Sequence, residues 1–453
     1  MILLKNCFHI ATLDDNKRLS DFNILIKGNR IEKIEKSTLR KPGYQAESTD
    51  IIDCSKHVVV PGFVNTHHHF YQTLTRNLPA VQNSKLFDWL TYLYEIWKNI
   101  DAQAVLYSSL VAIGELLKTG CTCTTDHHYL YPKGFQGDLM GLQFEAAATL
   151  GIRFSPCRGS MSWSKKDGGL PPDAVVQTEE EILKDSRRVI EQYHDPDAFS
   201  MKKIMLAPCS PFSVTRDLLV ESAGLARAMG VRLHTHLAET EDENEYCLKT
   251  HGKRPLALME ECEFIGEDVS YAHGIFFNDA ELQTLARTKT SIAHCPSSNM
   301  RLGSGIARVK EMLELGINVG LAVDGSASND SGDFLGEMRN ALLLQRVRSG
   351  ADALTAAKVF TMAAENGARL LNFPRIGKIK EGWAADLAIF NVHKLEYAGS
   401  LSDPLAALLF AGINHQTSYT VVNGRITVRE GRLTGFDEDK LAAEANRISQ
   451  TLF

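Results

Sequence analysis

The chain has 453 residues, 44% of them hydrophobic, which suits one large domain with an accessory domain beside it. Its 49 basic and 55 acidic residues give a net charge of −6 without a basic run, so nucleic acid is not an expected partner. We see no signal-peptide core and no run long enough to span a membrane, and therefore expect a cytoplasmic protein. The nine cysteines lack the spacing of a disulfide framework, and several lie inside apolar strands, as reduced, buried thiols do: Cys121, Cys123, Cys157 and Cys209.

The first 57 residues have the pattern of short strands and hairpins. Residues 24–34 are the clearest case, since two apolar strands flank the two-residue turn Gly28-Asn29. We expect residues 1–57 to form the first part of a small β-sandwich.

The middle of the chain, 58–372, alternates strands with helices. We expect strands at 58–68, 121–127, 153–159, 202–209, 231–237, 269–274, 291–295 and 318–324. We expect helices at 102–118, 137–150, 178–193, 215–229, 253–262, 279–288, 306–315, 333–348 and 354–371. Eight alternating strands predict an α/β fold, a (β/α)₈ barrel of the TIM type, with its active site at the C-terminal ends of the strands. The loop 160–177 is either a lid or a surface excursion.

The last segment, 373–453, returns to strand patterns and ends in a predicted helix. One strand is expected at 386–390, and 419–428 repeats the hairpin form around Asn423-Gly424. Neither flank alone can bury much apolar surface. We therefore expect 1–57 and 373–453 to meet in one small β-sandwich beside the barrel.

Histidines end the first barrel strand, in the run Thr66-His67-His68-His69. Side chains alternate along a strand, so His67 and His69 are expected on one face and His68 on the other. Two imidazoles so placed can bind one metal ion. Four later strands end in residues able to bind a metal or move a proton, namely His236, His273, His294 and Asp324. The pattern predicts a metal-dependent hydrolase, with His234 as an alternative to His236.

Four motifs together resemble the amidohydrolase superfamily over almost the whole chain. They are Pro61-Gly62-Phe63-Val64-Asn65-Thr66-His67-His68-His69, His236-Leu237-Ala238-Glu239, the strand ending at His273, and Val323-Asp324-Gly325. The nearest branch holds guanine, cytosine and S-adenosylhomocysteine deaminases and the triazine hydrolases. The resemblance implies that one divalent metal ion, usually zinc, is bound by His67, His69, His236 and Asp324. It also implies that Glu239 and His273 complete the catalytic set.

The chemistry of these residues agrees with that assignment. Three imidazoles and a carboxylate leave one position of a catalytic zinc site open for water, although Fe²⁺ or Mn²⁺ also accepts this set. Such a metal lowers the pKa of its water from 15.7 to about 7. Asp324 can accept the proton of that water, and His273 can orient the hydroxide or the developing oxyanion. Glu239 can protonate a ring nitrogen, help that typically contributes about 10²–10⁴-fold.

The fourth strand lacks a feature of the binuclear members of the superfamily, a carboxylated lysine at its end. Here it ends Leu206-Ala207-Pro208-Cys209, while Lys202 and Lys203 stand at its start. We therefore expect one metal ion.

The substrate is less sharply defined by the sequence. Five residues near strand ends are candidate substrate contacts, namely Gln72, Trp89, His127, Tyr131 and Cys209. The amide of Gln72 suits a ring carbonyl beside an N–H, and Trp89 could stack on a planar heterocycle or merely anchor a helix. Either His127 or His128 could touch substrate.

The segments around Gln72, Leu86-Phe87-Asp88-Trp89-Leu90 and His127-His128-Tyr129 resemble the 8-oxoguanine deaminases, which also accept isocytosine. The resemblance implies deamination of 8-oxoguanine to urate and ammonia. A hydroxytriazine amino or alkylamino hydrolase and a guanine or cytosine deaminase are alternatives. So is a non-catalytic, amidohydrolase-like interaction protein, although such a protein would lack metal ligands. A homodimer or higher homo-oligomer is compatible with the resemblance.

Overall fold

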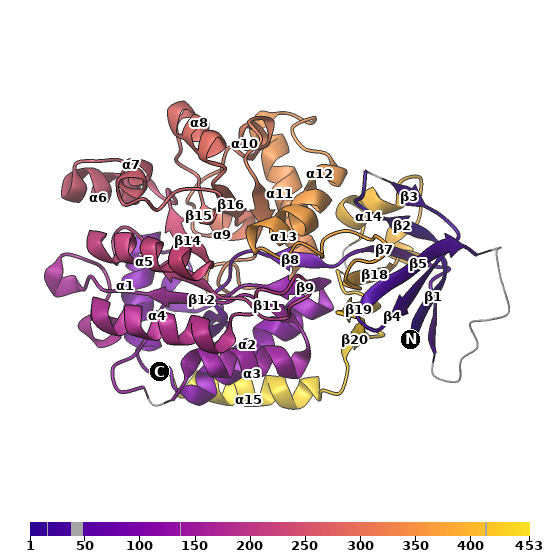
Figure 1. Cartoon of the computed structure of the whole chain (residues 1–453), viewed down its shortest axis with the longest axis horizontal. Coiled ribbons are helices and arrows are strands. Elements are labelled where there is room, and N and C mark those ends of the chain that lie inside the picture. Colours follow the sequence, from indigo (N-terminus) through magenta and orange to yellow (C-terminus); the bar gives the residue numbers. More distant parts are fainter. Residues whose placement is uncertain (16, 38–48, 136, 413–414) are drawn as a thin grey trace.

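The computed structural model describes residues 1–15, 17–37, 49–135, 137–412 and 415–453. Parts of the expected flanks 1–57 and 373–453 thus lie outside the described residues. Figure 1 shows two parts: a large barrel surrounded by helices, on the left, and a small pair of sheets, on the right.

Eight parallel strand positions form the barrel. They are β8 (Phe63–Asn65), β9 (Cys121–Thr124) continued by β10 (His127–His128), β11 (Arg153–Phe154) continued by β12 (Cys157–Ser160), β13 (Met205–Pro208), β14 (Arg232–Leu237), β15 (Val269–His273), β16 (Ser291–His294) and β17 (Val319–Leu321). The barrel closes where the Thr66 N–H donates to the Leu321 carbonyl at 3.0 Å. The predicted (β/α)₈ fold is confirmed.

The first expected strand, 58–68, is not one strand. Its first half, β7 (His57–Pro61), pairs antiparallel with β18 (Leu387–Asn391) in the small sheets, and its second half is β8 of the barrel. Gly62 separates them, and a Cβ there would lie 2.2 Å from the side chain of Thr122. This close approach lets the chain pass from one sheet to the other, and His67 to His69 follow the end of β8.

Buried apolar side chains from the barrel strands and the residues just after them pack in one cluster. They are Val64, Cys123, Cys157, Met205, Ala207, Ala293, Cys295 and Ala322. The histidines described below lie toward the C-terminal ends of the strands. All nine cysteines are buried and none forms a disulfide, and they include the four expected as buried thiols.

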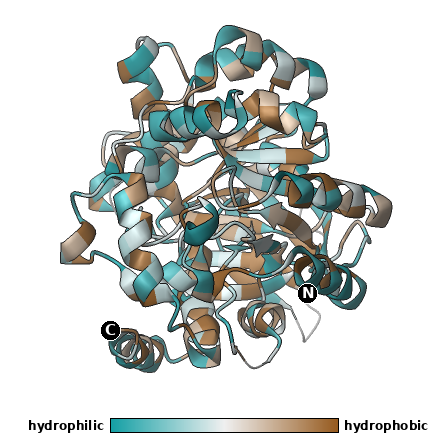
Figure 2. Ribbon diagram, turned by 90° about the vertical axis from the view of Figure 1, so that its left-hand side faces the viewer, coloured by the Kyte–Doolittle hydropathy of each residue, from teal (hydrophilic) through white to brown (hydrophobic). Residues whose placement is uncertain are grey.

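Helices cover the barrel, and Figure 2 shows hydrophilic residues along their outer faces. They are α1 (Leu86–Trp97), α2 (Ala102–Lys118), α3 (Leu139–Leu150), α4 (Glu179–Tyr193), α5 (Arg216–Met229), α6 (Glu241–His251), α7 (Pro255–Glu261), α8 (Asp279–Thr288), α9 (Pro296–Arg301), α10 (Val309–Glu314), α11 (Phe334–Ser349), α12 (Ala356–Thr361) and α13 (Gly367–Leu370). The expected helix 354–371 is broken by a π-turn at Met362–Asn366. Among the described residues, none of the helices has the length and apolar character needed to cross a membrane.

Two sheets from both ends of the chain form the predicted sandwich. The strands besides β7 and β18 are β1 (Ile2–Cys7), β2 (His9–Ala11), β3 (Arg18–Leu19), β4 (Phe22–Lys27), β5 (Arg30–Lys36), β6 (Asp50–Asp53), β19 (Tyr419–Val422), β20 (Arg425–Arg429) and β21 (Arg432–Leu433). Isoleucines 2, 10, 24, 26 and 389 pack in one buried cluster between them. The expected hairpins are β4–β5 and β19–β20, and Gly424 has the positive φ, 75°, that the latter turn requires.

The sandwich is joined to the barrel by a buried ion pair. Arg153 of β11 donates through Nε and Nη2 to the two carboxylate oxygens of Asp386, both at 3.1 Å. After α14 (Pro404–Phe410), the last helix, α15 (Glu438–Gln450), packs along α2 of the barrel (Figure 1). The exact division at 57/58 and 372/373 stays a prediction.

Candidate active site

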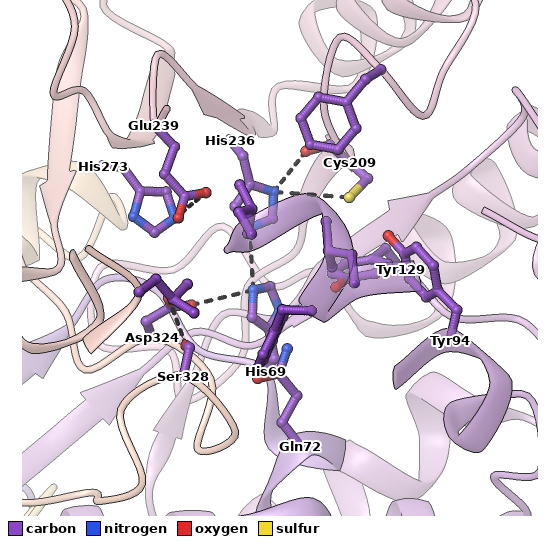
Figure 3. Close-up of a pocket in the computed structure, with 15 residues that line it drawn as sticks. His69, Gln72, Tyr94, Tyr129, Cys209, His236, Glu239, His273, Asp324 and Ser328 are labelled. Carbon is purple, nitrogen blue, oxygen red and sulfur yellow. Dashed lines mark hydrogen bonds and ion pairs between the residues drawn. The ribbon is translucent and has the colours of Figure 1, made fainter. Parts of the chain in front are cut away.

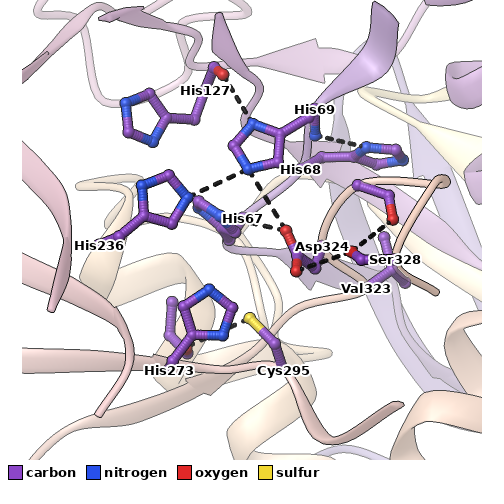
Figure 4. Close-up of polar contacts among 12 residues, drawn as sticks. His67, His68, His69, His127, His236, His273, Cys295, Val323, Asp324 and Ser328 are labelled. Carbon is purple, nitrogen blue, oxygen red and sulfur yellow. Dashed lines mark hydrogen bonds and ion pairs between the residues drawn. The ribbon is translucent and has the colours of Figure 1, made fainter. Parts of the chain in front are cut away.

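Three imidazoles and one carboxylate converge at the C-terminal ends of the barrel strands (Figure 4). His67 and His69 follow β8, His236 lies on β14, and Asp324 follows β17. Asp324 Oδ1 is 3.4 Å from Nε2 of both His67 and His69, and the Nε2 atoms of His69 and His236 are 3.1 Å apart. Donor atoms held about 2.0–2.1 Å from a tetrahedral zinc ion lie about 3.3 Å apart, so the cluster has the dimensions of one zinc site.

The hydrogen bonds of two of the imidazoles indicate that this cluster binds a cation. Nδ1 of His69 lies 2.8 Å from the His127 carbonyl, and Nδ1 of His236 lies 2.7 Å from the Cys209 carbonyl. A carbonyl accepts only, so each Nδ1 carries the proton and each Nε2 presents a lone pair. Burial lowers the pKa of both rings, which keeps them neutral. Two lone pairs 3.1 Å apart repel unless a metal ion lies between them.

Asp324 is placed by an unusual backbone conformation and by a hydroxyl. Its φ is 64°, and the Ser328 hydroxyl lies 3.1 Å from Oδ2. Burial alone would raise the pKa of Asp324, but the neighbouring imidazoles of His67 and His273 hold it well below its usual range. The group is thus a carboxylate, as a metal ligand and proton acceptor must be.

Glu239 and His273 form a second pair beside the cluster. Their Oε2 and Nε2 atoms are 3.4 Å apart, and both side chains are buried. Burial raises the pKa of Glu239 above its ordinary value. Burial alone would lower the pKa of His273, but the carboxylates of Glu239 and Asp324 outweigh it and raise that pKa. The pair can therefore store and move a proton.

Strand alternation does not by itself bring His273 to this position. Ser270 and Ala272 of β15 pair with His234 and His236, and alternation would turn His273 away from that face. His273 instead has a φ of 70°, which redirects the side chain, and its Nδ1 lies 2.9 Å from Asn299 Oδ1. In the first turn of α6, Glu243 accepts from the Ala238 and Glu239 N–H groups at 2.9 Å and so fixes the backbone of Glu239.

A pocket opens in front of these residues (Figure 3). It is lined by His69, Gln72, Leu86, Trp89, Leu90, Tyr94, Tyr129, Cys209, Phe212, His236, Glu239, His273, Leu302, Asp324 and Ser328. The structure thus places Gln72, Trp89 and Cys209 in one pocket with the candidate metal ligands His69, His236 and Asp324. Gln72 Oε1 accepts from the Ala327 N–H at 3.4 Å, which leaves its Nε2 as the donor available to a ligand. Trp89 packs edge-on against Trp97, and its buried Nε1 has no protein partner among the described residues.

Two expected substrate contacts lie elsewhere. Tyr131 does not line this pocket, because its ring lies beneath the guanidinium of Arg158, 3.9 Å from the ring centroid, in a separate hollow. His127 lies behind the ligands, with Nε2 3.0 Å from the Ala207 carbonyl, and belongs to the group of side chains able to hold the metal. Neither residue lines the pocket in front of the metal ligands, and a contact of either with substrate stays a prediction from the sequence.

Three other histidines near the strand ends are not positioned to bind the metal ion. His234 lies behind His67, His68 accepts from the His69 N–H at 2.8 Å, and His294 is buried. The loop 160–177 reaches the rim of the pocket, because the N–H groups of Ser162 and Trp163 donate to the Ser213 carbonyl beside Phe212. Its role as a lid stays a hypothesis.

Several lining residues were missed from the sequence. Tyr94, Phe212, Leu302 and Ser328 were not identified, since each lies on a loop or helix whose distance from the strands is set by tertiary structure. Ser328 had a detectable signal, because a hydroxyl four residues after a ligating aspartate can reach its carboxylate. The barrel and the site together define a metal-dependent hydrolase.

The comparisons with known proteins narrow this class. The model of the Amidohydrolase family matches residues 58–427. The 8-oxoguanine deaminase of Pseudomonas aeruginosa is 44% identical over 400 residues, which cover 88% of each chain. The hydroxydechloroatrazine ethylaminohydrolase of Pseudomonas sp. strain ADP is 35% identical, covering 89% of this chain and 85% of that protein. The crystal structure of atrazine chlorohydrolase TrzN from Arthrobacter aurescens TC1 complexed with zinc has a TM-score of 0.93 at 29% identity, covering 99% of this chain and 100% of that chain. The protein belongs to the amidohydrolase family, as its motifs predicted.

Proposed function

We propose that this protein is a zinc-dependent hydrolytic deaminase of an amino-substituted N-heterocycle, and that 8-oxoguanine is the substrate, giving urate and ammonia. One observation carries the reaction type. A buried carboxyl with a raised pKa, Glu239, lines the same pocket as the metal cluster and His273. The 44% identity to an 8-oxoguanine deaminase supports the particular heterocycle.

The chain's own residues divide the proton transfers between them. A zinc ion held by His67, His69, His236 and Asp324 would make hydroxide available at neutral pH. Asp324, ionised and adjacent to that position, accepts the proton of the attacking water. Glu239 gives a proton to the ring nitrogen next to the amino-bearing carbon, which makes that carbon electrophilic. His273 holds the oxygen that has added to the ring carbon. The proton that Asp324 took from water passes to the amino group, which leaves as ammonia. The added hydroxyl returns a proton to Glu239 as the ring carbonyl forms.

The walls of the pocket suit a flat, polar-edged ring. Leu86, Leu90 and Leu302 supply apolar surface, and Trp89 supplies an aromatic body whose N–H has no partner within the described part of the chain. The Nε2 group of Gln72 can donate to a ring carbonyl. An oxidised purine and isocytosine both offer a carbonyl next to the amidine that is hydrolysed.

The test is a substrate panel with purified, zinc-loaded protein. Ammonia release is measured with 8-oxoguanine, isocytosine, guanine, cytosine and a hydroxytriazine in parallel. We expect 8-oxoguanine to have the highest kcat/KM and guanine to be a poor substrate. No turnover of 8-oxoguanine by the fully metallated protein would exclude it as the substrate.

A hydroxytriazine amino or alkylamino hydrolase is the second candidate. It is favoured by the 35% identity to hydroxydechloroatrazine ethylaminohydrolase and by the fold of TrzN. The same metal and acid residues would serve, so the panel distinguishes the two. A non-catalytic interaction protein, the rival of another class, predicts a folded chain that binds no zinc, and a metal assay separates it from both enzymes.

A further inference from the structure

Two buried side chains behind His67 take no part in the pocket. His234 on β14 and Ser270 on β15 are direct neighbours in the strand register. Nδ1 of His67 lies 2.8 Å from Nε2 of His234, and Nδ1 of His234 lies 2.8 Å from Ser270 Oγ. Neither residue lines the pocket, and neither is one of the side chains whose donor atoms converge on the candidate metal site.

The direction of each hydrogen bond in this chain can be deduced from its far end. The Ser270 hydroxyl donates to the Leu233 carbonyl at 3.3 Å, because a carbonyl can only accept. Its oxygen is then free to accept from Nδ1–H of His234. His234 is fully buried and has no carboxylate among its hydrogen-bond partners, so it is the neutral imidazole and its Nε2 is bare. That nitrogen must accept from Nδ1–H of His67.

The consequence is that His67 presents an unprotonated Nε2 to the cluster. This nitrogen is buried and has no hydrogen-bond partner among the described residues, and it faces Asp324 Oδ1 at 3.4 Å. His69 and His236 have their Nδ1 protons fixed by backbone carbonyls. Of the three ligand imidazoles, His67 alone has its tautomer set by side chains.

We propose that His234 and Ser270 are positioning residues that hold His67 in the tautomer and orientation required for metal binding. They thereby set the zinc affinity of the site. Outer hydrogen-bond partners of ligating imidazoles typically contribute about 10–100-fold to metal affinity. The proposal concerns the metal and is independent of which heterocycle is the substrate.

The test measures zinc affinity by chelator competition without any substrate. H234L removes the acceptor for His67 and should weaken zinc binding by about 10–100-fold. H234Q can present Oε1 to His67 and Nε2 to Ser270, so it should restore most of the loss. S270A should fall between the wild type and H234L. S155A is the matched control, since the buried Ser155 hydroxyl has no partner among the described residues, and it should bind zinc like the wild type.

The thermal midpoint of the metal-free protein separates this role from a merely structural one. For H234Q and S270A it should stay close to that of the wild type, so that any loss of affinity reports on the ligand. Wild-type zinc affinity in H234L and S270A would overturn the proposal. If H234L does not fold, S270A against S155A decides, and equal affinities would overturn it. Since no substrate is used, failure of the 8-oxoguanine assignment leaves this result unaffected.

Discussion

Replacing Glu239 with glutamine would remove one titrating proton from the site with little change in shape. The backbone N–H of Glu239 donates to Glu243, and its Oε1 lies 3.4 Å from the Ser304 hydroxyl. A glutamine amide oxygen can keep the contact with Ser304, and the backbone bond does not depend on the side chain. Glu239 is not one of the residues whose donor atoms lie close enough together to bind one metal ion, so the glutamine variant should keep its zinc.

The expected loss follows from the role assigned to this carboxyl. General acid–base help contributes about 10²–10⁴-fold, which is about 3–5 kcal/mol of barrier at about 1.4 kcal/mol for each factor of ten. The Glu239 carboxylate also raises the pKa of His273. E239Q should therefore lower that pKa, and any residual activity should have an altered pH profile.

The assay compares kcat/KM for ammonia release in the wild type and E239Q, with zinc per chain measured on the same samples. We expect full zinc content and kcat/KM reduced by at least about 10²-fold. E239Q activity within a factor of ten of the wild type would refute the proton-transfer role. Loss of zinc from E239Q would refute it equally, because it would make Glu239 a metal ligand.

Three further outcomes are expected. Q72A should raise KM and lower kcat/KM by about two- to tenfold, since one substrate hydrogen bond contributes about 0.5–1.5 kcal/mol, and unchanged kinetics would remove Gln72 from the site. Chelation should abolish ammonia release and lower the thermal midpoint, and added zinc should restore both; activity that persists in demonstrably metal-free protein would contradict the assigned centre. Burial raises the pKa of Glu337 to about 8, so the folded chain holds a proton that the unfolded chain releases, and this contribution to stability is lost as pH rises between about 4 and 8. The stability advantage of the wild type over E337Q, read from thermal midpoints, should therefore shrink over that range, and a constant difference would argue against the raised pKa.

The barrel and the metal ligands could be predicted because their signals are local. A short apolar strand followed by a histidine or aspartate is visible in a few residues, and a parallel barrel brings all such ends to one face. His67, His69, His236 and Asp324 meet in the structure for this reason. His234 stands two residues before His236 and points to the same face of the strand, but it lies deeper in the barrel, behind His67.

Other features depend on contacts that no local pattern encodes. The break between β7 and β8 follows from the packing of Gly62 against Thr122, sixty residues later in the chain. His273 reaches the site through a positive φ, which strand alternation cannot predict. Tyr131 follows two histidines at a strand end, yet its ring packs against the buried guanidinium of Arg158 on the next barrel strand, a contact that no local pattern predicts.

The most direct test of the central claim is the rate of ammonia release from 8-oxoguanine by purified protein whose zinc content has been measured. The proposed function predicts turnover that requires zinc, yields urate in equal amount to ammonia, and exceeds the kcat/KM for guanine and for a hydroxytriazine. Fully zinc-loaded protein that leaves 8-oxoguanine intact while hydrolysing another heterocycle of the panel would contradict the substrate assignment.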